Sequence, residues 1–275
     1  MPPDTYLSAI LAFHRARGAA DGRDLDDLVA RALRAPATRP FAPPLSASAG
    51  DPLAVIAEVK RRSPSKGVID ADLDPGRAAA DYEAGGAACV SVLTDTEHFG
   101  GSPADLGAAR AACALPVLRK DFTVGAADVC DARLMGADAV LLIVAALSDD
   151  ELLGLRTLAE ELSLDAVVEV HDRAELGRAL DAGADIVGVN QRDLTTFAVD
   201  RDRALALAAH IPPEVVAVAE SGIEGPDDAR RLADAGYQAV LVGESLVRSA
   251  DRRAAVRALT GHRVGVRGRA HEVTG

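Results

Sequence analysis

The sequence predicts a parallel α/β protein, specifically a (β/α)8 TIM barrel with an N-terminal helical extension. Strand-like and helix-like segments alternate along the chain, and the strand-like segments can be counted as eight. A weak repeat supports this count, because four helix-like runs end in glycine just before a β-branched segment: Gly86, Gly136, Gly183 and Gly236. The spacings of 50, 47 and 53 residues (136 minus 86, 183 minus 136, 236 minus 183) each hold about two βα units of roughly 25 residues.

The eight expected strands are runs of Val, Ile, Leu and Ala, as is typical of parallel strands buried on both faces. They are 54–60, 87–93, 115–119, 138–144, 166–170, 185–190, 215–219 and 239–243. The expected helices between them are 74–85, 102–113, 125–136, 148–162, 173–182 and 225–236. Several of these begin with good cap or first-turn residues, such as Asp74-Pro75, Ser102-Pro103, Ser148 and Asp172.

The first 53 residues precede the barrel. Leu7, Ile10, Leu11 and His14 follow helical spacing, the run 24–33 predicts a second helix, and 35–52 has the composition of a linker. We expect this region to cap the floor or a side of the barrel. The predicted organisation is an extension over 1–53, a barrel over 54–260 and a tail over 261–275.

Composition excludes several function classes. The net charge of −12 argues against a nucleic-acid surface, and the longest apolar stretch, 139–147, is far too short to cross a membrane. The three cysteines, Cys89, Cys113 and Cys130, lie in apolar segments and predict reduced core residues. The six histidines lack metal-site spacing, and the first residues do not resemble a signal peptide. We therefore expect a cytoplasmic monomer without metal or cofactor.

Lysine is rare here and is placed selectively. Of 30 basic residues only Lys60, Lys66 and Lys120 are lysines, and each lies where a strand runs into a polar loop. Arginine is effectively never deprotonated, whereas lysine can give or take a proton. Chance placement explains one such lysine more readily than all three, so the pattern favours proton chemistry.

Polar residues follow the predicted strands at the end where barrel enzymes place their sites. They are Glu58, Lys60, Ser63 and Lys66 after strand one, Thr94, Asp95 and Phe99 after strand two, Lys120, Asp121 and Phe122 after strand three, Glu169 and His171 on strand five, Asn190 and Arg192 after strand six, Glu220, Ser221 and Gly222 after strand seven, and Gly243, Glu244 and Ser245 after strand eight. The fourth strand offers only apolar side chains and would form a wall.

Two of these groups point to particular chemistry. Ser221-Gly222 and Gly243-Glu244 follow strands seven and eight, where barrels commonly bind phosphate through backbone N–H groups. Glu58, Glu169 and Glu220 lie in apolar strands, and buried carboxylates need partners. They form either a structural network with Lys60, Lys120 and Arg192 or, as we favour, a proton-transfer site.

At this point the residues resemble the indole-3-glycerol phosphate synthase family. The matching motifs stand in order from about residue 54 to 250: IAEVKRRSPSKG, SVLTDTEHFGGS, LPVLRKDF, VVEVHD, VGVNQRDLTTF, VAESGI and VLVGESLV. The resemblance implies ring closure, decarboxylation and dehydration of 1-(o-carboxyphenylamino)-1-deoxyribulose 5-phosphate, a small phosphorylated substrate, to indole-3-glycerol phosphate, CO2 and water.

The resemblance also implies roles. Lys120 is the acid on the ketone oxygen, Glu169 is the base of the dehydration, and Lys60 contacts the substrate carboxylate and acts as second acid. Glu58 stabilises the aniline nitrogen. The other implied catalytic residues are Asn190, Glu220 and Ser221. The implied binding residues are Ser63, Phe99, Phe122, Arg192, Leu194, Gly222, Gly243 and Glu244, while Lys66 is equally well a solvated loop charge.

Two other functions remain open from the residues. A phosphoribosylanthranilate isomerase would share the phosphate loops but would use a Cys or Asp pair early in the barrel, without need of two lysines and three glutamates. A catalytically inactive barrel kept for partner binding would not need Lys60, Lys120 and Glu169 intact.

Overall fold

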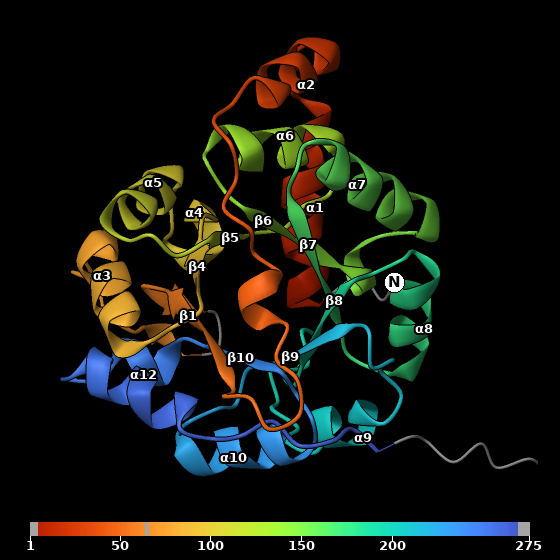
Figure 1. Ribbon diagram of the computed structural model, residues 1–275. Coiled ribbons are helices and arrows are strands. Elements are labelled where there is room, and N and C mark those ends of the chain that lie inside the picture. The colour runs from red at the N-terminus through yellow and green to blue at the C-terminus, as the bar shows by residue number, and fades with distance from the viewer. Residues whose placement is uncertain (1–4, 64–65, 269–275) are drawn as a thin grey trace, which may run out of the picture.

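The computed structural model describes residues 5–63 and 66–268. Pro64 and Ser65 of the predicted loop after the first strand, and the end of the predicted 261–275 tail, lie outside the described residues. Eight parallel strands close into a barrel in the order β1-β10-β9-β8-β7-β6-β5-β4 (Figure 1). The predicted fold class is therefore confirmed.

The strands coincide with the predicted segments to within a few residues. They are β1 (Ala54–Val59), β4 (Cys89–Leu93), β5 (Val117–Lys120), β6 (Ala139–Ile143), β7 (Asp165–Val170), β8 (Ile186–Asn190), β9 (Val216–Glu220) and β10 (Ala239–Val242). The barrel closes where β1 pairs with β10 on one side and with β4 on the other, through Ile56 beside Leu241 and beside Cys89.

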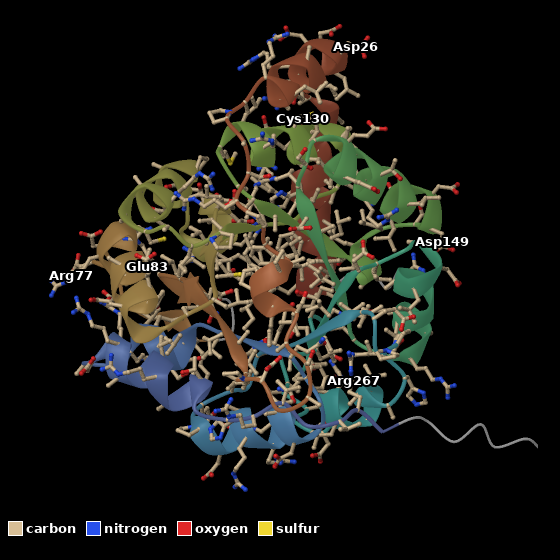
Figure 2. All side chains as sticks on the ribbon, in the orientation of Figure 1. Asp26, Arg77, Glu83, Cys130, Asp149 and Arg267 are labelled. Carbon is tan, nitrogen blue, oxygen red and sulfur yellow. The ribbon has the colours of Figure 1, made fainter. Side chains whose placement is uncertain are left out.

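The predicted helices lie around the strands. They are α3 (Pro75–Gly85), α5 (Pro103–Ala112), α6 (Ala126–Leu134), α7 (Asp149–Glu161), α8 (Arg173–Asp181) and α10 (Pro226–Asp234). The predicted caps act as expected, since the Asp74 side chain accepts the N–H of Arg77 at 3.0 Å and Ser148 forms a capping box with Glu151. Charged side chains such as Asp149 project outward (Figure 2).

Several short elements were not predicted. They are the hairpin β2 (Arg62–Ser63) and β3 (Gly67–Val68), and the helices α4 (Thr96–Phe99), α9 (Arg203–Ala208), α11 (Glu244–Val247) and α12 (Arg252–Thr260). Most of them are too short for a periodic pattern. The hairpin, α4 and α11 sit in loops at the end of the barrel that carries the site. Within the described ranges, no helix has the length and apolar character needed to cross a bilayer.

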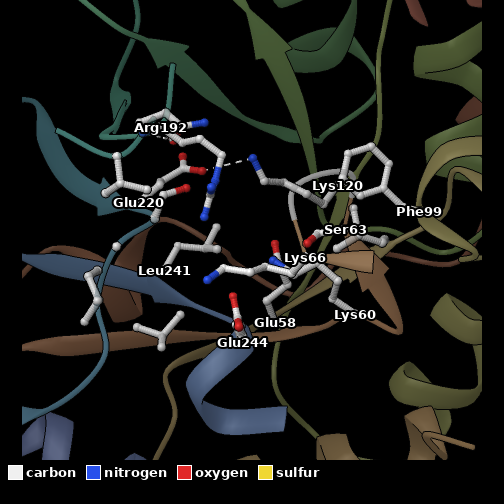
Figure 3. Close-up of a pocket in the computed structure, with 18 of the residues that line it drawn as sticks. Glu58, Lys60, Ser63, Lys66, Phe99, Lys120, Arg192, Glu220, Leu241 and Glu244 are labelled. Carbon is white, nitrogen blue, oxygen red and sulfur yellow. Dashed lines mark hydrogen bonds and ion pairs between the residues drawn. The ribbon is translucent and has the colours of Figure 1, made fainter. Parts of the chain in front are cut away.

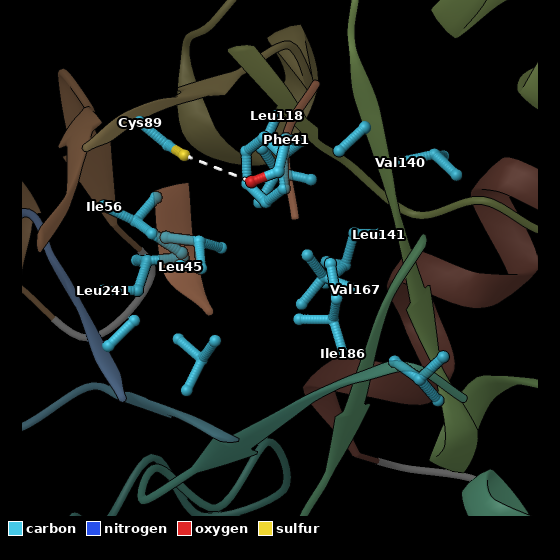
Figure 4. Packing of buried hydrophobic residues seen from close by; sticks show 14 of the residues in the cluster. Phe41, Leu45, Ile56, Cys89, Leu118, Val140, Leu141, Val167, Ile186 and Leu241 are labelled. Atoms are coloured by element: carbon cyan, nitrogen blue, oxygen red, sulfur yellow. Dashed lines mark hydrogen bonds between the residues drawn. The ribbon is translucent and has the colours of Figure 1, made fainter. Parts of the chain in front are cut away.

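The segment after the N-terminal helices closes the floor of the barrel. Phe41 and Leu45, the latter in the short 3-10 turn η1 (Pro43–Leu45), are fully buried. Asp165 at the start of β7 accepts the backbone N–H groups of Phe41 and Ala42, each at 3.0 Å. Figure 4 shows these side chains packed against the interior of the strands. Residues 39–45 therefore plug the floor.

The helix α1 (Tyr6–Ala19) lies at the opposite end of the barrel. Its His14 contacts Asp95 after β4, and its Arg15 donates to the carbonyl of Ala146 after β6. The second helix, α2 (Leu25–Leu33), packs on α6. In Figure 1, η1 lies over the middle of the barrel while α1 runs behind the strands. The expectation that these helices cap the floor or a side is thus wrong for α1, because its apolar face meets the loops at the site end.

Candidate active site

A cavity of about 870 Å³ opens at the C-terminal ends of the strands. All of the residues to which the resemblance assigns a role line it: Glu58, Lys60, Ser63, Phe99, Lys120, Phe122, Glu169, Asn190, Arg192, Leu194, Glu220, Ser221, Gly222, Gly243 and Glu244. Lys66 lines it as well. Thr94 and His171, which also follow predicted strands, are not among the residues that line it. In Figure 3, Glu58 of β1, Lys120 of β5 and Glu220 of β9 point toward the cavity from different strands. The barrel geometry brings together residues up to 186 positions apart, from Glu58 to Glu244.

Lys120 is the centre of the charged group. Its Nζ, at the end of β5, donates to Glu169 on β7 at 2.7 Å and to Glu220 on β9 at 2.9 Å. Burial alone would lower the pKa of Lys120, but the two carboxylates outweigh it and raise the pKa above the usual lysine value. Lys120 therefore holds its proton firmly and is in the form that can donate it.

The two carboxylates beside Lys120 differ in their pKa. Burial raises the pKa of both, but Lys120 and then His171 bring the pKa of Glu169 below its ordinary value. Glu220 has a raised pKa because burial dominates and the negative Glu169 opposes a second charge. One oxygen of Glu220, Oε1, is buried without a hydrogen-bond partner among the described residues. Of these two neighbouring carboxyl groups, Glu169 is therefore the stronger acid and Glu220 the weaker acid.

A second ion pair lies at the end of β1. Glu58 and Lys60 are two positions apart, so their side chains point to the same face of the strand, and they contact each other directly. Gly243 faces them closely, because a Cβ there would come within 2.5 Å of Oε1 of Glu58. Because Gly243 has no side chain, the Glu58 and Lys60 side chains fit beside it.

Asn190 connects Glu169 to the loop after β8. Its Nδ2 donates to Oε1 of Glu169 at 3.0 Å, and its Oδ1 accepts the backbone N–H of Arg192 at 2.9 Å. The Arg192 guanidinium donates to the carbonyl of Phe197 at 3.0 Å. In the structural network that we considered, Arg192 would pair with a carboxylate; instead it braces its own loop and lines the cavity.

The loops after β9 and β10 form the other end of the cavity. Ser221 and Gly222 both adopt left-handed backbone conformations, with φ of 68° and 70°. Glycine adopts this conformation without strain, and a side chain at Gly222 would also collide with Val199 at 2.5 Å. The helix α11 begins directly after Gly243. These turns present backbone N–H groups of the kind that bind phosphate in barrels.

An apolar wall lies opposite these loops. Phe99 and Phe122 face each other with ring centroids 6.3 Å apart, and Leu141 and Ile143 of β6 join Leu194 along the lining. The prediction that the fourth barrel strand supplies an apolar wall is confirmed. The wall has the size and character to receive an aromatic ring.

The loop with Ser63 and Lys66 is tied to its neighbour. Arg62 donates to the carbonyls of Glu97 and His98 in α4 at 2.8 and 3.0 Å. Sequence analysis did not single out Arg62, and its position in a run of basic residues gave no signal of this contact. The site loop after β1 is thus held by the loop after β4.

The helix α1 is fastened to that same loop by a buried cluster. Oδ2 of Asp95 lies 2.8 Å from Nε2 of His14 and 2.9 Å from Nδ1 of His98, while its Oδ1 accepts the N–H of His98 at 2.6 Å. The three side chains come close enough together to suggest a metal site. A metal-bound Nε2 would leave the other ring N–H of His14 needing an acceptor, yet Nδ1 is buried with no partner in the described structure. The arrangement therefore fits hydrogen bonding better than metal ligation.

Other cavity residues were also missed. Thr196, Phe197, Val199 and Arg201 lie in the loop after β8, and Arg248 follows α11. Phe197 and Arg201 had no motif chemistry to mark them, although Phe197 falls inside the VGVNQRDLTTF motif. Tyr6 of α1 packs edge-on against Phe197, with ring centroids 5.0 Å apart. The N-terminal helix therefore packs against a residue that lines the cavity.

A closed (β/α)8 barrel with partly buried lysines and buried carboxylates in a cavity at its C-terminal end defines a barrel enzyme. The family model described as indole-3-glycerol phosphate synthase matches residues 13–259. The chain belongs to this family, and it is accordingly a lyase.

Relatives bear this out. The chain is 52% identical over 232 residues to an indole-3-glycerol phosphate synthase of Streptomyces griseus subsp. griseus, covering 84% of this chain and 85% of the relative. It is 56% identical over 207 residues to that of a Nocardioides species, covering 75% and 80%. Among solved structures, a thiamine phosphate pyrophosphorylase from Pyrococcus furiosus matches with a TM-score of 0.57 and 17% identity, covering 76% of this chain and 94% of that one. This last likeness concerns the fold alone.

Proposed function

We propose that this enzyme converts 1-(o-carboxyphenylamino)-1-deoxyribulose 5-phosphate into indole-3-glycerol phosphate, CO2 and water, as a step of tryptophan biosynthesis. The observation that supports it most is the position of Lys120, between two buried carboxylates of different pKa and between an apolar wall and two phosphate-type turns. Ring closure needs an acid, a base, an aromatic binding wall and a phosphate site in one cavity.

Binding sets the substrate across the cavity. The backbone N–H groups of Gly222, Gly243 and Glu244, with the hydroxyl of Ser63, hold the phosphate. Phe99, Phe122 and Leu194 enclose the aromatic ring at the other end. Holding both ends in this way brings the ring carbon to the ketone and lowers the entropic cost of closure.

The first step joins the ring carbon to the ketone carbon. As the new C–C bond forms, the C=O electron pair moves to oxygen and takes the proton of Lys120. Lys60 and Arg192 hold the substrate carboxylate, and Glu58 stabilises the positive charge that develops on the aniline nitrogen. Loss of CO2 then returns the C–C electron pair to the ring.

Dehydration completes the indole. Glu169 removes a proton, and Lys60 protonates the leaving hydroxyl so that it departs as water. Asn190, Glu220 and Ser221 orient the sugar hydroxyls and the two reacting side chains. Lys120 and Lys60 each give a proton and Glu169 takes one. When the substrate carboxylate is ionised, each turnover therefore consumes one proton from solution.

The two alternatives find less support. An isomerase of the phosphoribosylanthranilate type would use an early Cys or Asp pair, but the early barrel cysteine, Cys89, is buried and its Sγ points to the carbonyl of Phe41 at the floor, 3.7 Å away. An inactive barrel would have no need to keep Lys60, Lys120 and Glu169 around one cavity.

The test is to add the purified chain to the substrate, without added metal or cofactor, and follow indole fluorescence. The chain contains no Trp, so its own fluorescence interferes little. We expect turnover that inorganic phosphate inhibits competitively. A folded chain that makes no indole, but isomerises phosphoribosylanthranilate, would replace this proposal with the isomerase function; a folded chain inactive on both would favour the inactive barrel.

A further inference from the structure

His171 lies beside the proposed base without having a role in the proposed reaction. It follows β7, two positions after Glu169, and both its backbone N–H and its ring contact Oε2 of Glu175 in α8, at 2.7 and 3.0 Å. Its other ring nitrogen, Nε2, lies 3.6 Å from Oε1 of Glu169. The side chains of Glu169, His171 and Glu175 thus form a line from the proposed base to the outside of the barrel.

The contacts with Glu175 determine which nitrogen of the ring carries a proton. Oε2 of Glu175 already accepts the backbone N–H of His171, and a carboxylate oxygen only accepts, so we assign the proton of their second contact to Nδ1 of His171. In the neutral ring Nε2 is then bare, and it is buried with no hydrogen-bond partner among the described residues. The lone pair of an unprotonated Nε2 would repel the carboxylate of Glu169, whereas an N–H at Nε2 would be attracted to it. The surroundings of His171 therefore favour the imidazolium form.

The position of His171 separates it from the substrate. Glu169 lines the cavity and is 1% exposed, whereas His171 lies behind it, outside the set of described residues that line the cavity. The side chains of His171 and Glu175 are 12% and 18% exposed, toward the outside of the barrel. His171 therefore touches the base and not the substrate.

The remaining charges around this line are few. Arg203 of α9 opposes a charge on His171, while Glu169 and Glu175 favour it. Lys120 and Asn190 contact Glu169 from the cavity side, and Glu220, which shares Lys120, is a neighbouring carboxylate whose charge and that of Glu169 oppose each other. With a carboxylate on each side of the ring, the balance favours the cation.

We propose that His171, fixed in tautomer and orientation by Glu175, is a positioning residue that holds Glu169 ionised and aimed into the cavity. This inference rests on the proposed function, in which Glu169 is the base. Lys120 binds one oxygen of Glu169, and Asn190 and His171 face the other, so the carboxylate is restrained on both of its oxygens. A base held in this way needs little reorganisation when it takes its proton.

The directions of the pKa shifts agree with this arrangement. Burial lowers the pKa of His171, but Glu175 and Glu169 outweigh it and raise the pKa above the ordinary histidine value. For Glu169, burial raises the pKa, and Lys120 and His171 bring it below the ordinary value. Removing His171 should therefore raise the pKa of Glu169 and move the acid limb of the pH–rate profile to higher pH.

The experiment compares His171→Leu, which removes every ring contact, with His171→Gln, which keeps an N–H donor but no charge. We expect kcat of the Leu variant to fall about tenfold, because the carboxylate of Glu169 loses a restraint on one of its oxygens, with KM changed far less. The acid limb should move upward in both variants, and Gln should recover part of kcat. His210→Gln, in the loop before β9 at the other end of the barrel, is the matched control.

A second measurement does not depend on turnover. The ¹⁵N spectrum of the wild-type imidazoles should show His171 protonated at Nδ1, and Glu175→Gln should change that signal. A Leu variant with the wild-type kcat and pH profile, or a His171 ring with Nε2 as its only protonated nitrogen, would overturn the inference. If the wild type makes no indole, the proposed function fails, whereas a normal wild type with an unaffected Leu variant sinks only the role of His171.

Discussion

Nζ of Lys120 lies 2.7 Å from Oε2 of Glu169, although 49 residues separate them in the sequence. They sit at the ends of β5 and β7, two strands that flank β6 in the barrel. The proposed acid and the proposed base are thus in direct contact in a cavity that also contains Glu220. This contact keeps Lys120 charged and Glu169 ionised, which are the forms that each role requires.

The first prediction concerns Lys120→Arg. Arginine keeps the positive charge but cannot give up its proton, so we expect kcat to fall by roughly 10²–10⁴-fold, the usual contribution of a positioned acid or base. The circular dichroism spectrum and the melting temperature should stay close to those of the wild type. Turnover near the wild-type rate would remove Lys120 as the acid.

The second prediction concerns the stability cost of Glu220. Its pKa is raised in the folded chain by burial, so the folded chain binds its proton more tightly than the unfolded chain, and ionisation destabilises the fold as pH rises. Glu220→Gln should therefore add about 1–2 kcal/mol to the free energy of unfolding at pH 7.

The gain from Glu220→Gln should disappear below about pH 4, where the carboxyl is protonated in both folded and unfolded chains. Lys120 keeps Glu169 as its partner in the variant. Urea unfolding at pH 4 and pH 7 measures the difference. A variant that is less stable at pH 7 would show that the charge on Glu220 stabilises the fold.

The third prediction concerns Gly188 on β8. A Cβ at this position would overlap Oε1 of Glu220, so Gly188→Ala should displace that carboxylate and lower kcat by about tenfold or more. Gly177→Ala in α8 is the control, because no atom lies within 4 Å of its added Cβ. The control should gain about 0.5–1 kcal/mol from helix propensity, with normal activity. Equal kinetics for the two variants would argue that the position of Glu220 is unimportant.

The fourth prediction concerns Asp95. Burial raises its pKa, but hydrogen bonds from His14 and His98 outweigh it and lower the pKa below the usual range. Its contribution to stability is therefore present at neutral pH and is lost as pH falls below about 4 toward the folded pKa. Asp95→Ala should cost about 3 kcal/mol at pH 7, since it leaves several buried donors unpaired, and less at pH 3.

Urea unfolding of Asp95→Ala and wild type at both pH values tests this. Limited proteolysis should also cut α1 sooner in the variant, since His14 fastens that helix to the barrel. If the loss of unfolding free energy in Asp95→Ala is the same at both pH values, the Asp95 side chain stabilises the fold by packing rather than by its charge.

The strands and most helices could be predicted because their signals are local. Runs of Val, Ile and Leu mark buried strands, and Asp74-Pro75 or Ser148 marks a helix start. The position of the candidate site residues around the cavity could be predicted because the barrel rule converts a position along the chain, the end of a strand, into a position in space. Glu58 and Glu244 needed no further information to be placed in one cavity.

The rest depends on contacts between distant segments. His14 shows helical spacing like its apolar neighbours, and nothing local reveals that its partner is Asp95, 81 residues later. Phe41 likewise gives no local signal of its partner, because its segment has the composition of a linker. Its backbone N–H donates to Asp165, which holds the segment in the floor of the barrel. The unequal pKa values of Glu169 and Glu220 arise from burial and from their shared lysine, which composition cannot reveal.

The closure of β1 on β10 also bears on synthesis of the chain. β1 leaves the ribosome before the other strands of the barrel, and its partner β10 emerges about 180 residues later. Until then one edge of β1 has unpaired backbone groups that could pair with another nascent chain. The nascent barrel must therefore stay open through most of translation, and a chain truncated before residue 239 should aggregate rather than form a smaller enzyme.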